Sequence, residues 1–196
     1  WRMIPCSKGR TVAAFGCRVY GGRHSVDGKF YVCSTQGKQI VVFDSERHNR
    51  LLLPSKVIEA RHIRWTITDV DMTPCRKFVC YSTMTSAVSL TNIIGEYELH
   101  DSMNLGHSNN FGVFCLRFGA GGQEIVAGCN DYCMRVFDIE RKTLVSEVMA
   151  HDNDVNAVAF ADNSFRSDVV FTGSDDSLIK VWDRRMLSTG VGGYAR

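Results

Sequence analysis

Short apolar segments that end in an aromatic residue followed by aspartate recur along this chain at a nearly constant interval. Three of them end in Phe43-Asp44, Phe137-Asp138 and Trp182-Asp183, and a weaker copy ends in Thr91-Asn92. The last residues of the four segments lie 48, 46 and 45 positions apart. Self-similarity at such a period indicates a fold of stacked units, so the repeat has to be interpreted before any single motif.

Three histidines mark the beginning of the same interval. His62, His107 and His151 lie 45 and 44 residues apart, and each comes 29 to 31 residues before the aromatic position of its repeat. Val113–Phe118 and Val155–Phe160 then alternate as half-buried strands do, and turn residues follow them. An early Gly-His and a late Trp-Asp at ~40–45 residues are the signature of the WD40 repeat. The chain therefore resembles the WD40 family, which implies an all-β fold of β-propeller blades.

The repeats divide the chain into four expected blades, and the resemblance implies a ring of about seven. The blades cover approximately residues 12–58, 59–104, 105–149 and 150–196. We therefore expect residues 1–196 to form a partial WD40 β-propeller. Trp1 does not suggest a natural start, and residues 186–196 offer no clear outermost strand. In the second and third blades, Glu96–Leu99 and Leu144–Val148 are expected to supply that strand.

The fourth repeat is the most complete of the four. It resembles the buried hydrogen-bond tetrad of the WD40 family, whose matching residues here are His151, Thr172, Asp176 and Trp182. An imidazole, a hydroxyl, a carboxylate and an indole N–H can satisfy one another within a blade, so we expect these residues to be structural. The third repeat is a poorer match, with His107, Ala127, Asp131 and Phe137 at the corresponding positions.

Two arginines follow the last Trp-Asp, in the sequence Asp183-Arg184-Arg185. This segment resembles the WDxR, or DWD, box of the DCAF proteins, which are WD40 substrate receptors of cullin-4 ubiquitin ligases. In that family the arginine two places after the aspartate docks on the damaged-DNA-binding-protein adaptor, and Arg185 matches it. The resemblance therefore implies that Asp183, Arg184 and Arg185 bind the adaptor. A planar five-donor guanidinium suits such a contact. The third repeat has Glu140 where the box needs arginine, so one box is visible.

Further segments extend the resemblance to one DCAF subfamily, plant members included, over about residues 18–187. They are Arg64–Val70, Phe111–Phe114, Gln123–Gly128 and Ser174–Asp176. The resemblance implies a substrate receptor of a cullin-4 RING ubiquitin ligase, with the adaptor and an unidentified substrate protein as partners. The alternatives are a general WD40 interaction scaffold that never meets the ligase, and a propeller enzyme.

No residue pattern suggests catalysis, a cofactor or a metal site. Asp69, Asp71, Asp152 and Asp154 fall where a blade begins, where we expect solvated polar residues. His48 and His100 have no partner by spacing and are expected at the surface, and His24 takes a strand position typical of a half-buried side chain. We therefore expect no enzymatic activity.

The composition limits the classes of binding partner and the cellular compartment that we expect for this chain. Twenty-three Lys and Arg against 21 Asp and Glu leave a formal charge of +2, too balanced for direct nucleic-acid or anionic-membrane binding. No run of 18 apolar residues occurs. The cysteines at 33, 80, 115 and 129 lie within apolar runs, as buried thiols do, which favours a reducing compartment, the nucleus and cytoplasm.

Overall fold

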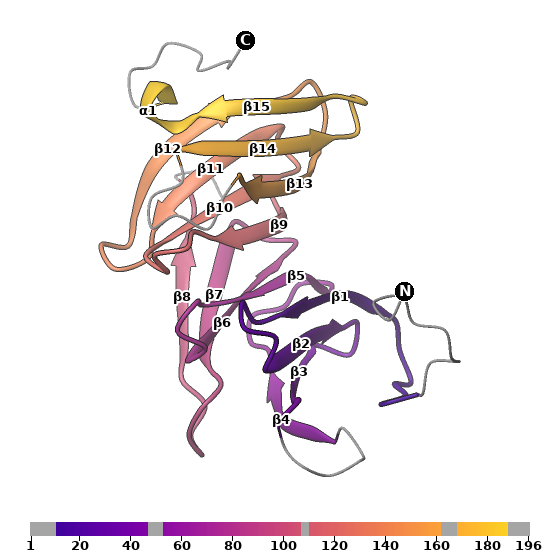
Figure 1. The fold of residues 1–196 in the computed structure, drawn as a ribbon. Helices are drawn as coiled ribbons and strands as arrows, with labels where there is room; N and C mark the ends of the chain where they lie inside the picture. Colours follow the sequence, from indigo (N-terminus) through magenta and orange to yellow (C-terminus); the bar gives the residue numbers. More distant parts are fainter. Residues whose placement is uncertain (1–10, 47–52, 107–109, 162–167, 188–196) are drawn as a thin grey trace, which may run out of the picture.

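The computed structural model describes residues 11–46, 53–106, 110–161 and 168–187, and these consist mainly of short strands (Figure 1). The described elements are β1 Val19–His24, β2 Phe30–Thr35, β3 Gln39–Asp44, β4 Pro54–Glu59, β5 Ile67–Met72, β6 Phe78–Thr83, β7 Ala87–Asn92, β8 His100–Asn104, β9 Val113–Phe118, β10 Glu124–Cys129, β11 Cys133–Asp138, β12 Thr143–Met149, β13 Val155–Phe160, β14 Val169–Ser174, β15 Ile179–Asp183 and α1 Arg184–Leu187.

The strands form four sheets in chain order. β1–β4, β5–β8 and β9–β12 are four-stranded sheets, and β13–β15 form a sheet of three described strands. Every pairing within the sheets is antiparallel. The prediction of an all-β chain of antiparallel blades is confirmed, and we number the sheets blades 1 to 4.

The first strand of each blade lies against the first strand of the next, so β1, β5, β9 and β13 follow one another along the inner side of the stack (Figure 1). Hydrogen bonds from Leu116 to Asp69 and from Phe118 to Asp71 hold β5 and β9 in parallel register. The loops that precede these first strands therefore share one face, the start face. The loops at their ends share the opposite face, the end face.

Apolar residues fill the spaces between neighbouring blades. Ile58 and Tyr81 belong to the cluster between blades 1 and 2, and Val88 and Leu116 belong to the cluster between blades 2 and 3. Trp182 belongs to the cluster between blades 3 and 4, and all five side chains are fully buried. Because each cluster draws residues from two sheets, a blade completes its core only by packing against its neighbour.

The hairpin turns repeat from blade to blade. Gly28, Arg76 and Gly122 close the first turn of blades 1, 2 and 3 with φ of 72°, 61° and 71°. Each donates its N–H to the carbonyl three residues earlier, at 2.8 to 2.9 Å. Since an arginine adopts a left-handed conformation that favours glycine, the turn geometry is set by the repeat rather than by the residue type.

The outer strand of blade 2 begins later than predicted. Glu96–Leu99 was expected to form it, but β8 covers His100–Asn104. The Asn92 amide donates to the carbonyls of Ile94 and Tyr97 and accepts from the Leu99 N–H, which closes a loop across the expected strand. In blade 3, β12 includes the predicted segment. The helical turn α1 was not predicted, and most of residues 186–196 lie outside the described ranges.

Candidate functional site

The structure brings the four predicted tetrad residues of blade 4 together in one hydrogen-bonded chain. Trp182 Nε1 donates to Thr172 Oγ1 at 2.8 Å, and that hydroxyl lies 2.7 Å from His151 Nε2. His151 Nδ1 in turn lies 2.7 Å from Asp176 Oδ2. Because an indole only donates and a carboxylate only accepts, the Thr172 hydroxyl donates to Nε2 and His151 carries its proton on Nδ1. The buried polar groups of this blade are thereby paired.

Asp176 anchors this chain from the turn between β14 and β15. Burial raises the pKa of Asp176, but hydrogen bonds from the Leu178 N–H, the His151 ring and the Asp152 N–H outweigh burial and lower the pKa to about 2. The Leu178 and Asp152 nitrogens lie 2.9 and 3.2 Å from the carboxylate. A carboxylate held ionised by this many donors stabilises a turn and is unsuited to proton transfer near neutral pH.

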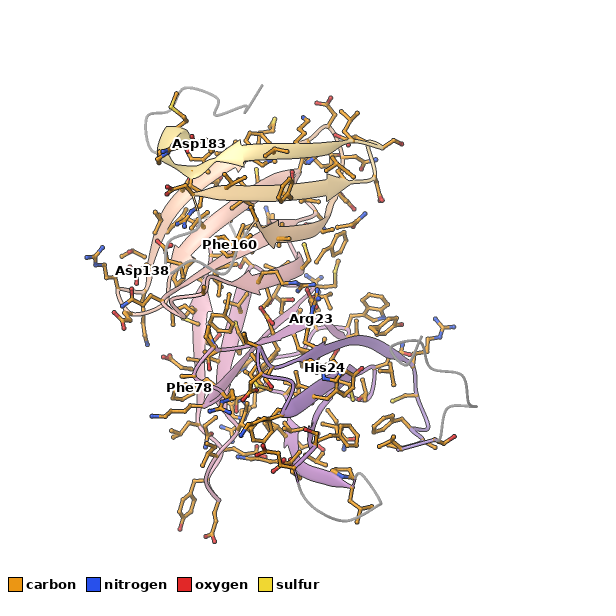
Figure 2. All side chains as sticks on the ribbon, in the orientation of Figure 1. Arg23, His24, Phe78, Asp138, Phe160 and Asp183 are labelled. Atoms are coloured by element: carbon orange, nitrogen blue, oxygen red, sulfur yellow. The ribbon has the colours of Figure 1, made fainter. Side chains whose placement is uncertain are left out.

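The predicted docking residues lie on the end face, where β15 passes into α1. Figure 2 shows Asp183 at this junction. Asp183 Oδ1 accepts from the Arg185 N–H at 3.0 Å, as a residue that caps a helix does. The Arg185 guanidinium makes a fork to the same carboxylate, with Nε at 2.9 Å and Nη2 at 2.6 Å. The Arg185 hydrogen bond lowers the pKa of Asp183. The Arg185 side chain remains 69% exposed, so its guanidinium is oriented at the surface.

Arg184 points away from that surface and contacts blade 3. Its Nη2 lies 2.5 Å from Glu124 Oε2 at the start of β10, and its guanidinium lies 5.5 Å from the ring centroid of Phe160. The Arg184 side chain is only 15% exposed. Arg184 therefore joins blades 3 and 4, whereas the sequence predicted that it binds the adaptor together with Asp183 and Arg185.

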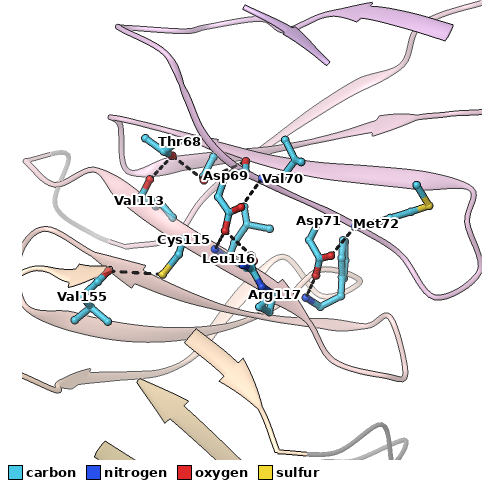
Figure 3. A network of polar contacts seen from close by, with 12 residues as sticks. Thr68, Asp69, Val70, Asp71, Met72, Val113, Cys115, Leu116, Arg117 and Val155 are labelled. Carbon is cyan, nitrogen blue, oxygen red and sulfur yellow. Dashed lines mark hydrogen bonds and ion pairs between the residues drawn. The ribbon is translucent and has the colours of Figure 1, made fainter. Parts of the chain in front are cut away.

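The expectation of a solvated side chain is wrong for Asp69, and Asp71 is half-buried (Figure 3). Asp69 is 8% exposed, and its Oδ2 accepts from the Leu116 N–H at 3.1 Å and pairs with Arg117. Asp71 Oδ2 accepts from the Phe118 N–H at 2.8 Å. Burial raises the pKa of both carboxyls to about 6, against the opposing effect of these backbone hydrogen bonds.

The spacing of these two aspartates explains their role. The first strand of a blade has an edge without a strand partner, and its N–H groups need acceptors. Alternate residues of β5 present Asp69 and Asp71 on one side, and alternate N–H groups of β9 face them. The Asp-x-Asp pattern was the available signal for this link between blades.

The histidines differ in their surroundings. The surface prediction for His100 is wrong, because its side chain is 5% exposed and its Nδ1 lies 3.2 Å from the Tyr81 hydroxyl. His24 is exposed rather than half-buried, with its ring centroid 4.7 Å from that of Tyr31. His62 is exposed, unlike His151 in the same sequence register. The predictions for residues 48 and 107 fall outside the described ranges.

The cysteines at 33, 80, 115 and 129 are buried, as predicted. Burial raises the pKa of the Cys129 thiol to about 12, which keeps it protonated and unreactive. Within the described ranges, no cluster of three His, Cys, Asp or Glu side chains is placed to bind a metal ion. None of the described helices has the length and apolar character to cross a membrane.

Known proteins resemble this chain in sequence and fold. The family model for the WD domain, G-beta repeat, matches residues 100–138 and 142–183. The LEC14B protein of Lithospermum erythrorhizon is 33% identical over 196 residues, which cover 94% of this chain and 40% of that protein. A DDB1- and CUL4-associated factor 11 homolog of Caenorhabditis briggsae is 27% identical over 201 residues, which cover 94% of this chain and 35% of that protein.

The chain thus spans 40% or less of the length of these two relatives. Among solved structures, the β-propeller domain of Cps50 (Swd1) from Myceliophteria thermophila superimposes with a TM-score of 0.75. The superposition covers 89% of this chain and 55% of that domain, at 10% identity. It establishes the architecture of the described blades as that of a β-propeller.

Proposed function

The chain carries WD40 repeats, and from that premise we propose that it belongs to a substrate receptor of a cullin-4 RING ubiquitin ligase. Its propeller holds a target protein and docks on the damaged-DNA-binding-protein adaptor. The chemistry of ubiquitin transfer takes place on other subunits, so this chain acts as a scaffold rather than an enzyme. The receptor works in the nucleus and cytoplasm, where the ligase would meet its targets.

One observation carries the proposal. Relatives named DDB1- and CUL4-associated factor 11 align with 92–94% of the chain, and the aligned chain exposes Arg185 at the position that matches the DWD box. The Asp183 fork orients the guanidinium before any partner arrives, which reduces the side-chain entropy lost on binding. Arginine is one of the residue types enriched among those that dominate interface energies.

The test is co-purification of the adaptor with the full-length protein. Arg185→Ala removes the oriented guanidinium and leaves the buried tetrad intact, so we expect adaptor recovery to fall at least about tenfold without a change in melting temperature. Arg141→Ala is the matched control, because Arg141 is an 81% exposed arginine in the corresponding end-face turn of blade 3 and also pairs with an aspartate. Equal recovery of the adaptor with Arg185→Ala and Arg141→Ala would favour a WD40 scaffold unrelated to the ligase.

A further inference from the structure

A hollow of about 510 Å³ opens on the start face between blades 2 and 3. Its lining comes from four loops, those before β5 and β9 and those joining β6 to β7 and β10 to β11. The lining residues are Arg64, Trp65, Met84, Asn110, Phe111, Gly112 and Asn130. Arg185 lies at the end of β15, so this hollow and the proposed adaptor site occupy opposite faces of the blades.

The Trp65 indole dominates the rim of this hollow. It is 56% exposed, although burying such a side chain is strongly favourable. Tyr20 on blade 1 is 43% exposed, and its ring centroid lies 6.2 Å from that of Trp65. Two adjacent exposed aromatic rings beside a concave surface are typical of a protein-binding site.

The floor of the hollow is held in place by close backbone packing. A Cβ on Gly112 would lie 3.0 Å from Met84 Cα, so a larger residue would push these two loops apart by a few tenths of an ångström. Asn130 Oδ1 accepts from the Gly112 N–H at 2.7 Å. Asn130 is half-buried and lines the hollow, so its amide group is within reach of a ligand there.

The charge of the hollow selects an anionic ligand. Arg64 is its one titratable lining residue, and none of the ion pairs among the described residues involves it. Arg61 and His62 are exposed on the same loop. The Arg64 guanidinium and the Asn130 amide can bind a carboxylate of the ligand. The Trp65 indole beside them can pack against an apolar side chain next to that carboxylate.

We infer that this hollow binds a polypeptide segment in which an acidic residue pairs with Arg64 and a neighbouring apolar residue packs on Trp65. A polypeptide fits better than RNA, although aromatic rings and arginine also suit bases. Asp152, Asp154 and Asp175 stand on the start face of blade 4 and would repel a phosphate backbone that ran across that face. Describing the segment as part of a ubiquitination target rests on the proposed function, whereas the binding itself does not.

The probe is a phage library of random twelve-residue peptides, selected on the full-length wild-type protein and in parallel on Trp65→Ala and Arg64→Gln. The control variant is Tyr97→Ala, which removes an 84% exposed ring from the β7–β8 loop on the end face. We expect wild type and Tyr97→Ala to enrich peptides with a carboxylate beside an apolar residue. Synthetic copies of these peptides should bind Trp65→Ala and Arg64→Gln at least about tenfold more weakly.

Three results would overturn the inference. They are no enrichment on the wild type, enriched peptides that lack carboxylates, and full affinity for Trp65→Ala. Tighter binding of a twelve-nucleotide oligouridylate than of any selected peptide, lost in Trp65→Ala, would assign the hollow to RNA instead. Because Trp65 lies on the face opposite Arg185, Trp65→Ala should still recover the adaptor. Loss of adaptor recovery only in Arg185→Ala therefore tests the proposed function separately.

Discussion

Blades 3 and 4 place an aspartate in the same turn and pair it in different ways. Asp131 precedes Tyr132 with φ 68°, and Asp176 precedes Ser177 with φ 69°. In blade 4 the partner of Asp176 is His151. A chain of hydrogen bonds then continues from His151 to Thr172 and Trp182 in the interior of the blade. In blade 3 the partner of Asp131 is an arginine from the same hairpin.

That arginine is Arg135, which is 3% exposed. Its Nη1 and Nη2 donate to Asp131 at 2.9 and 2.6 Å, its Nε donates to Glu147 at 3.1 Å, and its guanidinium lies 3.8 Å from the ring centroid of Phe111. Blade 3 has Ala127 and Phe137 in place of the threonine and tryptophan, so no polar chain can run inward. Blades 3 and 4 thus share the turn aspartate, and its partner differs with the presence or absence of polar groups in the interior of the blade.

The largest expected effect comes from breaking the inward chain of blade 4. Thr172→Val keeps the side-chain shape and leaves the Trp182 N–H and His151 Nε2 unpaired in a buried site. Each unpaired group should cost about 1–3 kcal/mol of unfolding free energy. Urea unfolding of the full-length protein measures this cost. Thr143→Val, an exposed change on β12, is the control, and an equally small effect of both changes would show that the chain does not stabilise the blade.

Removing the arginine of blade 3 should cost less. Arg135→Met fills a similar volume but leaves Asp131 and Glu147 without their cation. Their side chains are 31% and 43% exposed and can be hydrated, so we expect a loss of about 1–2 kcal/mol. The same urea titration checks this value. A loss larger than that of Thr172→Val would reverse the ranking of the two blades.

A smaller effect, which depends on pH, is expected at Asp71. This residue links blades 2 and 3 and, unlike the turn aspartates of blades 3 and 4, belongs to a strand. The folded pKa of Asp71, about 6, lies above its ordinary value of 3.8, so the folded state binds the proton more tightly. The stability from this carboxyl is complete below pH about 4 and is lost as the pH rises through 6. Asp71→Asn should therefore reduce the fall in melting temperature between pH 4 and 7 by about 2–4 °C. An unchanged pH profile would contradict the raised pKa of the half-buried Asp71 carboxyl, and Asp101→Asn, at an exposed site, is the control.

The smallest effect is expected where Arg184 joins blade 4 to blade 3. Arg184→Gln removes a partly exposed ion pair with Glu124 and keeps most of the side-chain length. Such pairs contribute about 0–1 kcal/mol. Thermal unfolding should shift by no more than about 4 °C. A larger shift would mean that this pair, rather than the apolar cluster around Trp182, holds the two blades together.

The sequence predicted the features that repeat along the chain, because each repeat restates the same local pattern. The four sheets and the members of the blade 4 tetrad could be named from the spacing of His151 and Trp182. The links between blades could not be predicted in this way. Asp69 reaches a backbone N–H 47 positions away, and Arg184 reaches Glu124 across 60 positions. The Asp-x-Asp pattern marks the first link but does not name its partner, and the second link has no local signature.

The hollow beside Trp65 escaped the sequence interpretation for the same reason. Its four loops belong to two blades, and Gly112 lets two of them approach closely at Met84. The delayed start of β8 has a different cause. The Asn92 side chain hydrogen-bonds across the following loop, and propensity alone does not anticipate side-chain bonds of this kind.

The central claim is that this chain belongs to a receptor that docks on the adaptor through its end face. The most direct measurement is a titration of the purified adaptor with the full-length protein at physiological salt, repeated with Arg185→Ala and Arg141→Ala. The account predicts saturable binding with a Kd below about 1 μM, weakened at least about tenfold by Arg185→Ala and unchanged by Arg141→Ala. Absence of binding at about 10 μM adaptor, or equal affinity of all three proteins, would contradict it.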